Sequence, residues 1–141
     1  MKVVILCIFT FLNQFLIGDY RDIYISQDEF RVTDAYQHLS EQKQITDDEL
    51  CYKAVFECMY ADYLVNPYQK FNHFINGYAL LNNLIEKHPR NPEYRYHRYM
   101  IEEHAPAWLI ENNKGYDKQF VITQITKSHP MYDFIMKTIN N

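Results

Sequence analysis

Glycine, proline and cysteine are scarce in this sequence. Its 141 residues include 3 Gly, 5 Pro and 3 Cys. So little glycine and proline excludes a collagen-like chain, a Gly-rich phosphate-binding loop, a disordered linker and most turn-rich β-sandwiches. Hydrophobic residues make up 48% of the chain and charged residues 23%, which suits one compact domain. We therefore expect an all-α protein with no sheet.

The sequence also lacks any concentration of positive charge. It has 14 Lys and Arg against 18 Asp and Glu, which gives a formal net charge of −4, and no run of four or more basic residues occurs. Proteins that bind nucleic acid by its phosphates carry a basic patch or stripe. We therefore expect no nucleic-acid partner.

The start of the chain differs in composition from the remainder. An apolar run extends from Val3 to Ile17 and ends at Gly18, before a charged segment. This run is too short to span a bilayer comfortably, and such a layout is typical of a secretory signal peptide. We predict that residues 1–18 are a signal peptide, or an uncleaved anchor because Leu16 is large for a position near a cleavage site. Residues 19–141 are then a single helical domain, periplasmic or secreted, with no other membrane contact.

Two capping boxes predict two helix starts. In each box a Ser or Thr can accept a hydrogen bond from the backbone of a Glu three residues later, while the Glu side chain reaches back. The first box is Ser26 with Glu29, and the second is Thr46 with Glu49. We expect a helix to begin directly after Ser26 and another directly after Thr46.

Further helix starts are marked by proline. Asn66-Pro67 and Asn91-Pro92 each place an N-cap residue before a proline at the first helical position. We expect another helix from about residue 116 to residue 127, although residues 120–123 would also suit a strand, and a short last helix near Ser128. The prediction is thus five to six helices.

The helix expected over residues 47–65 carries an unusual seam of small side chains. The seam consists of Cys51, Ala54, Cys58, Ala61 and Val65. Apolar residues also cover the other faces of this helix, so we expect it at the centre of the domain, with one neighbour close against the seam. Cys51 and Cys58 are seven residues apart on one helix, too far for a disulfide, and we expect two buried thiols.

The turn over residues 84–94 resembles the junction of tetratricopeptide-like repeats, in which one helix ends at a Pro and the next begins a few residues later. No repeat period of about 34 residues is visible, so we expect stacked antiparallel helical hairpins rather than a solenoid. Residues 89–106 and the helix start at 116–118 resemble small exported helical proteins of Bacteroidota that have no assigned activity. This resemblance implies an exported helical protein over residues 49–125, and it implies no catalytic residues.

Three polar residues share one face of the helix expected after Pro92. Arg95, Arg98 and Glu102 follow one another at spacings of three and four residues. Such a cluster can hold the following loop through hydrogen bonds from Arg to carbonyl oxygens, or it can bind an anionic ligand. Both interpretations remain open from the sequence.

No pattern of catalytic or metal-binding residues is present. Glu93, His97 and His104 fall near one line of the same helix, but the histidines are seven residues apart and no His-Glu-x-x-His spacing occurs. A Gly-x-Ser-x-Gly nucleophile elbow is also missing. We expect no metal, no cofactor and no enzymatic activity.

The function that these observations favour is binding of another protein or a peptide. A groove between helical hairpins would bind the partner, and the candidate anchors are Tyr94, Tyr96, Tyr99 and Trp108. The alternative is a small-ligand-binding or hydrolytic protein that uses Arg95, Arg98, Glu102 and His104. We expect a monomer or a weak dimer in either case.

Overall fold

The computed structural model describes residues 16–141, which form seven α-helices and one short 3-10 turn. The helices are α1 (Ile17–Ser26), α2 (Glu29–Glu41), α3 (Asp47–Tyr63), α4 (Pro67–Lys87), α5 (Pro92–His104), α6 (Lys114–Gln124) and α7 (Tyr132–Ile139), and the turn η1 is Ala107–Leu109. No strand occurs among these residues, which confirms the all-α prediction. Of the predicted signal peptide, residues 1–15 lie outside the described part of the chain.

The predicted count of five to six helices was too low because α1 was missed. Tyr20, Ile23 and Tyr24 are buried on one face of α1, at the spacing of an amphipathic helix. This segment was predicted to be the start of the mature protein, and no helix was predicted there. Gly18, the predicted end of the signal peptide, lies inside α1.

The first predicted capping box is wrong. Ser26 is the last residue of α1, and its hydroxyl donates to the carbonyl oxygen of Ile23 at 2.6 Å. Gln27 then adopts a left-handed conformation with φ of 52°, which ends α1. Asp28 is the actual N-cap of α2, and its carboxylate accepts from the backbone N–H of Arg31 at 2.9 Å.

The predicted starts of α3, α4 and α5 are confirmed. Thr46 and Glu49 form the expected reciprocal capping box at the start of α3. Asn66 and Asn91 cap α4 and α5, each by accepting from two backbone N–H groups ahead of it. The segment that would also suit a strand is helical, in α6, whereas α7 begins at Tyr132, a few residues after the predicted start.

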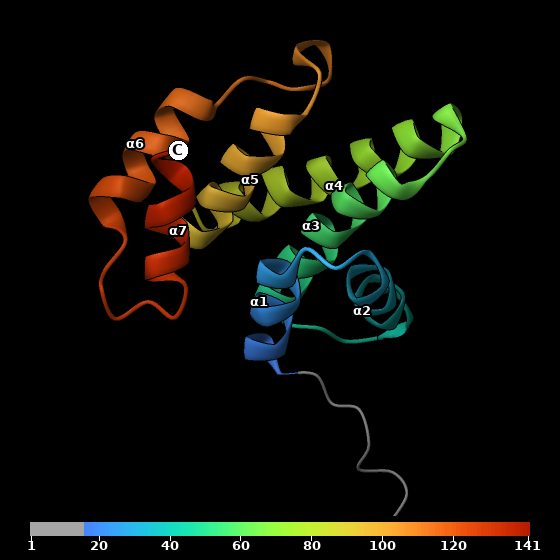
Figure 1. Ribbon diagram of the computed structural model, residues 1–141, viewed down its shortest axis with the longest axis horizontal. Coiled ribbons are helices and arrows are strands. Elements are labelled where there is room, and N and C mark those ends of the chain that lie inside the picture. The colour runs from blue at the N-terminus through green and yellow to red at the C-terminus, as the bar shows by residue number, and fades with distance from the viewer. Residues whose placement is uncertain (1–15) are drawn as a thin grey trace, which may run out of the picture.

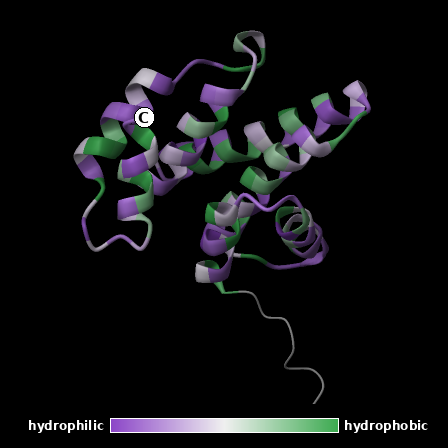
Figure 2. Ribbon diagram, viewed as in Figure 1, coloured by the Kyte–Doolittle hydropathy of each residue, from purple (hydrophilic) through white to green (hydrophobic). Residues whose placement is uncertain are grey.

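Helix α3 lies at the centre of the fold, as predicted. It packs along α4 on one side and against α2 on another (Figure 1). Helix α5 packs against α4, and α6 packs against α5. Hydrophobic and hydrophilic residues alternate along each ribbon, as expected for helices with one buried face (Figure 2).

The seam of small residues on α3 makes the predicted close contact, and its neighbour is Gly77 of α4. Val65, which was also predicted to belong to the seam, lies beyond the end of α3 at Tyr63 and is 96% exposed. A Cβ at Gly77 would lie 2.6 Å from the carbonyl oxygen of Ala54 and 2.8 Å from Sγ of Cys58. Both cysteines are buried free thiols, and burial raises the pKa of each. Small side chains here therefore allow the backbones of α3 and α4 to approach closely.

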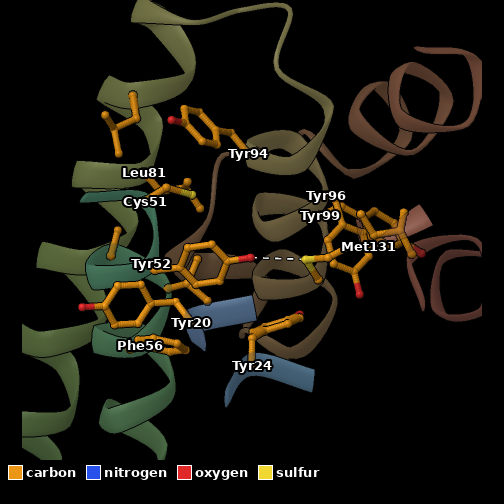
Figure 3. Packing of buried hydrophobic residues seen from close by; sticks show 14 of the residues in the cluster. Tyr20, Tyr24, Cys51, Tyr52, Phe56, Leu81, Tyr94, Tyr96, Tyr99 and Met131 are labelled. Carbon is orange, nitrogen blue, oxygen red and sulfur yellow. Dashed lines mark hydrogen bonds between the residues drawn. The ribbon is translucent and has the colours of Figure 1, made fainter. Parts of the chain in front are cut away.

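Tyrosine rings fill much of the core between α1, α3 and α5 (Figure 3). Tyr20 stacks on Tyr52 at 6.2 Å between ring centroids, and Tyr52 also packs against Phe56. The Tyr52 hydroxyl reaches Sδ of Met131, just before α7, at 3.2 Å. The core thus brings residues from the two ends of the described chain together.

Candidate functional site

The predicted arginine cluster is buried and pairs with a carboxylate of α6. Arg98 donates to both oxygens of Asp117, through Nε at 2.6 Å and Nη2 at 2.8 Å, and Arg95 Nη1 donates to the same carboxylate at 2.9 Å. Asp117 has no exposed surface, and both arginines are 7% exposed. Both guanidinium groups therefore bind a carboxylate of the protein itself in the position where the alternative function would place a ligand anion.

The other donors of these arginines also bind the protein itself. Arg95 Nε donates to the carbonyl oxygen of Pro89 at 2.8 Å, and its guanidinium lies over the rings of Tyr116 and Phe120. Arg98 contacts Asn82 of α4. The loop carbonyl that Arg95 binds thus precedes α5, whereas the expectation was for the loop after it.

Glu102, the third member of the predicted cluster, has a separate set of partners. Its carboxylate accepts from the Tyr78 hydroxyl at 2.6 Å, from the Asn113 backbone N–H at 2.6 Å and from the Asn113 side-chain amide at 3.0 Å. The Tyr78 oxygen accepts in turn from the backbone N–H of Glu111 at 3.0 Å. Burial and the bond to Glu102 raise the pKa of Tyr78 to about 12, so this hydroxyl stays protonated near neutral pH. Glu102 therefore holds the loop after α5, the role that was considered for the arginines.

The three candidate tyrosines of α5 lie in the interior. Tyr94 is 3% exposed, Tyr96 has no exposed surface, and Tyr99 is 9% exposed. The Tyr94 hydroxyl donates to Asp48 at 2.5 Å, and the Tyr96 hydroxyl lies 2.7 Å from that of Thr138. These rings pack between helices, so they are not presented to a partner in this conformation.

His104 and Trp108 are both on the surface. His104 is exposed, and its Nδ1 lies 2.8 Å from the carbonyl oxygen of Met100, so it does not join the arginine cluster. Trp108 is 77% exposed and stacks almost parallel to Phe71 of α4, at 6.4 Å between ring centroids. Tyr68, one turn before Phe71, is 74% exposed. We call Tyr68, Phe71 and Trp108 the Trp108 surface.

A polar cluster centred on Glu93 was not predicted. Arg21 of α1 donates to both oxygens of Glu93, at 3.0 and 2.8 Å. Tyr52 of α3 donates at 2.5 Å, and His129 of the α6–α7 loop lies at 3.1 Å. Burial alone would raise the pKa of Glu93, but hydrogen bonds from His129 and Arg21, together with the His97 ring 3.9 Å away, hold it well below its usual range.

His97 of the Glu93 cluster carries a buried ring nitrogen without a hydrogen-bond partner among the described residues. This nitrogen is Nδ1, and Nε2 of the same fully buried ring lies 3.4 Å from the Tyr52 hydroxyl. His104, which the sequence placed on the same line, lies on the surface at the other end of α5. Within residues 16–141, no group of three or more His, Cys, Asp or Glu is arranged to hold a metal ion.

The members of the Glu93 cluster come from segments for which the sequence predicts other roles. Arg21 lies in the segment that was placed at the start of the mature chain, and His129 lies where a helix start was expected. The periodicity of Tyr20, Ile23 and Tyr24 would have identified α1, but no local pattern pairs Arg21 with Glu93.

No helix in residues 16–141 combines the length and the apolar character needed to cross a bilayer. Comparison of the chain with protein-family models, curated proteins and solved structures found no match. The candidate function therefore depends on the residues of this chain alone.

Proposed function

We propose that this protein is a protein- or peptide-interaction module and that its partner binds at the Trp108 surface. One observation carries the proposal: Trp108 is 77% exposed while its ring stacks on Phe71. Exposed aromatic residues that lie together mark interaction sites more often than scattered ones do. Tryptophan is also among the residues that contribute most binding energy at interfaces.

The size of the Trp108 surface favours a short partner segment. A Tyr, Phe or Trp side chain offers about 200 Å² of surface, so the exposed parts of these three rings add up to roughly 400 Å². A standard protein–protein interface uses about 800 Å² on each side. We therefore infer a peptide, or a single helix of a partner protein, that places apolar side chains against these rings.

The helical arrangement that we infer around this surface is a stack of antiparallel hairpins similar to tetratricopeptide-like repeats. Helices α3 and α4 pack along one another, and so do α5 and α6. The turn between the two pairs contains Pro89, and Pro92 is the first residue of α5. An assembly of this kind is compatible with a monomer or a weak dimer.

We also propose that the protein is exported, as its apolar start and its resemblance to exported proteins of Bacteroidota suggest. Export with cleavage predicts a mature protein that begins near Asp19. Mass spectrometry of the protein from the periplasm or the medium would check this. An intact Met1 on the exported protein would contradict cleavage, and recovery with the membrane would favour the anchor.

The binding proposal can be tested with a random peptide library displayed on phage. Peptides that the wild-type protein selects are labelled, and their affinity is measured with the wild type and with Trp108→Ala. Loss of a central aromatic anchor costs about 2 kcal/mol or more, which corresponds to roughly 30-fold weaker binding. Phe30→Ala is the matched control, because Phe30 is 81% exposed but lies on α2. Equal affinity of Trp108→Ala and wild type would refute the proposal.

A further inference from the structure

We propose that Glu102 and Tyr78 form a latch that holds the loop between α5 and α6, and that this latch positions Trp108 for binding before a partner arrives. The proposal rests on the proposed function, because it concerns the same surface. Glu102 is then a positioning residue, since it acts on Trp108 through the loop backbone.

The hydrogen bonds of the latch hold the C-terminal end of the loop, just before α6. The loop leaves α5 after His104, passes through η1 with Trp108, and returns to α6 at Lys114 (Figure 1). On its return, the backbone N–H of Glu111 donates to Tyr78, and that of Asn113 donates to Glu102. Asn112 lies between them with φ of 61°, a left-handed conformation that Asn tolerates better than most residues.

Helix α4 supplies Tyr78 of the latch and also the support for the Trp108 ring. Phe71, which stacks on Trp108, and Tyr78, which binds Glu102 and Glu111, are seven residues apart on α4. Seven residues are about two helical turns, or roughly 10 Å, so both side chains lie on nearly the same face of the helix. The loop is therefore held against one rigid element at two points, one aromatic and one polar.

The chemistry of Glu102 indicates that its purpose is to order the loop. Glu102 is 1% exposed, and a buried carboxylate needs several hydrogen bonds to compensate for lost hydration. Its donors in this structure are all neutral: a hydroxyl, a backbone amide and a side-chain amide. Two of these three donors belong to Asn113, where the loop ends. The buried carboxylate of Glu102 thus keeps a surface loop in one conformation.

An ordered loop would favour binding. A partner that meets a mobile tryptophan must order the side chain and its loop, and the entropy of that ordering reduces affinity. In this protein the ordering has already taken place during folding. The same exposed ring without the latch would bind more weakly, with the contacts to the partner unchanged.

The latch can be tested without any partner by backbone amide hydrogen exchange. In the wild type, the N–H groups of Glu111 and Asn113 should exchange slowly although they belong to a surface loop. Glu102→Gln replaces one carboxylate oxygen by a donor that must face another donor, so exchange at both amides should accelerate about ten- to a hundredfold. Glu103→Gln is the matched control, because Glu103 is the next residue and its ion pair with Lys114 is exposed.

Trp108 supplies a second signal, since it is the single tryptophan of the chain. Its time-resolved fluorescence anisotropy should acquire a fast component in Glu102→Gln and not in Glu103→Gln, at a temperature where both variants are folded. If Glu102→Gln does not fold, Tyr78→Phe gives the same measurement, because it removes the hydroxyl and keeps the ring stacked on Phe74. Unchanged exchange and anisotropy in the folded variant would overturn the latch.

Binding of a phage-selected peptide connects the latch to the proposed function. Glu102→Gln should weaken that binding about three- to tenfold, the cost of ordering a side chain at an interface, whereas Glu103→Gln should not. Wild-type affinity in a variant whose loop is mobile would overturn the positioning role. Wild-type affinity in Trp108→Ala would instead refute the binding proposal, and the exchange experiment would still report on the latch.

Discussion

The two ends of helix α5 each bury a glutamate, and the two glutamates have different partners. Glu93 near the start of α5 is 5% exposed and binds the guanidinium of Arg21. Glu102 near its end is 1% exposed and binds neutral donors. One side-chain type on one helix thus forms a charge-paired cluster at one end and an uncharged set of hydrogen bonds at the other.

The partners explain the different consequences of these two sites. Glu93 joins α1, α3 and the α6–α7 loop, so its hydrogen bonds contribute to the packing of the whole domain. Glu102 joins α5 to α4 and to the end of the loop before α6. The location of its partners therefore decides whether a buried carboxylate stabilises the domain or shapes its surface.

The largest effect is expected for Glu93→Gln. The change leaves Arg21 without its carboxylate and replaces one acceptor oxygen by an NH2 group, so either Tyr52 or His129 loses its acceptor. The free energy of unfolding should therefore fall by about 3 kcal/mol. Arg21 keeps 17% of its side-chain surface exposed and can regain some hydration, which places the effect at the lower end of the range for broken buried pairs. Urea denaturation would measure it, with the exposed Glu86→Gln as the control. A loss no greater than that of the control would contradict the comparison.

Acid should reduce the contribution of Glu93. Because hydrogen bonds hold the pKa of Glu93 below its ordinary value of 4.5, ionised Glu93 stabilises the folded state at higher pH. This stabilisation is complete above the ordinary pKa and is lost as the pH falls through the lower pKa of the folded state. The difference in unfolding free energy between wild type and Glu93→Gln should therefore shrink as the pH is lowered below about 4. A difference that stayed constant with pH would mean that another group is responsible.

Gly77→Ala should give an intermediate effect and weaken the Glu102 end alone. The added Cβ would lie 2.6 Å from a backbone oxygen of α3, which cannot move aside, so α4 must shift. We expect the free energy of unfolding to fall by about 1–2 kcal/mol, because the cost of overpacking exceeds the gain in helix propensity. Because Tyr78 follows Gly77, amide exchange at Glu111 should also accelerate.

Gly115→Ala is the control for this substitution, because no atom lies within 4 Å of the added Cβ. It should raise stability by up to about 1 kcal/mol. Equal stability of the two alanine variants would show that the contact of α4 with α3 tolerates a larger residue.

The smallest effect on stability is expected for Glu102→Gln. The loss of unfolding free energy should be about 1 kcal/mol, since hydrogen bonds to one surface loop are disturbed and no cation loses its partner. Thermal and urea denaturation of Glu93→Gln and Glu102→Gln under the same conditions would compare the two ends directly. A loss for Glu102→Gln as large as that for Glu93→Gln would show that the loop supports the whole domain.

Much of the fold could be predicted, and the exceptions have identifiable causes. The starts of α3, α4 and α5 were predicted from Thr46, Asn66 and Asn91, because a cap and the groups that it satisfies lie within three residues of one another. The same reasoning failed at Ser26, whose hydroxyl turns back to α1, because a Ser near a helix end can bond to carbonyls behind it as well as to amides ahead of it.

The candidate site was harder to predict than the fold. The sequence placed Arg95, Arg98 and Glu102 on one face of a helix, and all three are buried there. It could not predict that the arginines bind Asp117 while Glu102 binds the loop. Trp108 was predicted as an anchor together with three tyrosines, and the structure buries all three tyrosines. The residue type of an aromatic side chain does not by itself reveal whether it faces the core.

Local interactions explain what the sequence determined by itself: an all-α domain, the helix starts at three caps, and the small seam of α3. Each of these depends on neighbours within one or two turns of the chain. Only the tertiary structure decided which charges meet, because Arg21 and Glu93 are 72 positions apart and His129 and Glu93 are 36 positions apart. Such pairs form where packed helices place the groups within hydrogen-bond distance, and burial then strengthens each bond by excluding water. The same packing decided that Trp108 stays outside the core, on a loop held by Glu102.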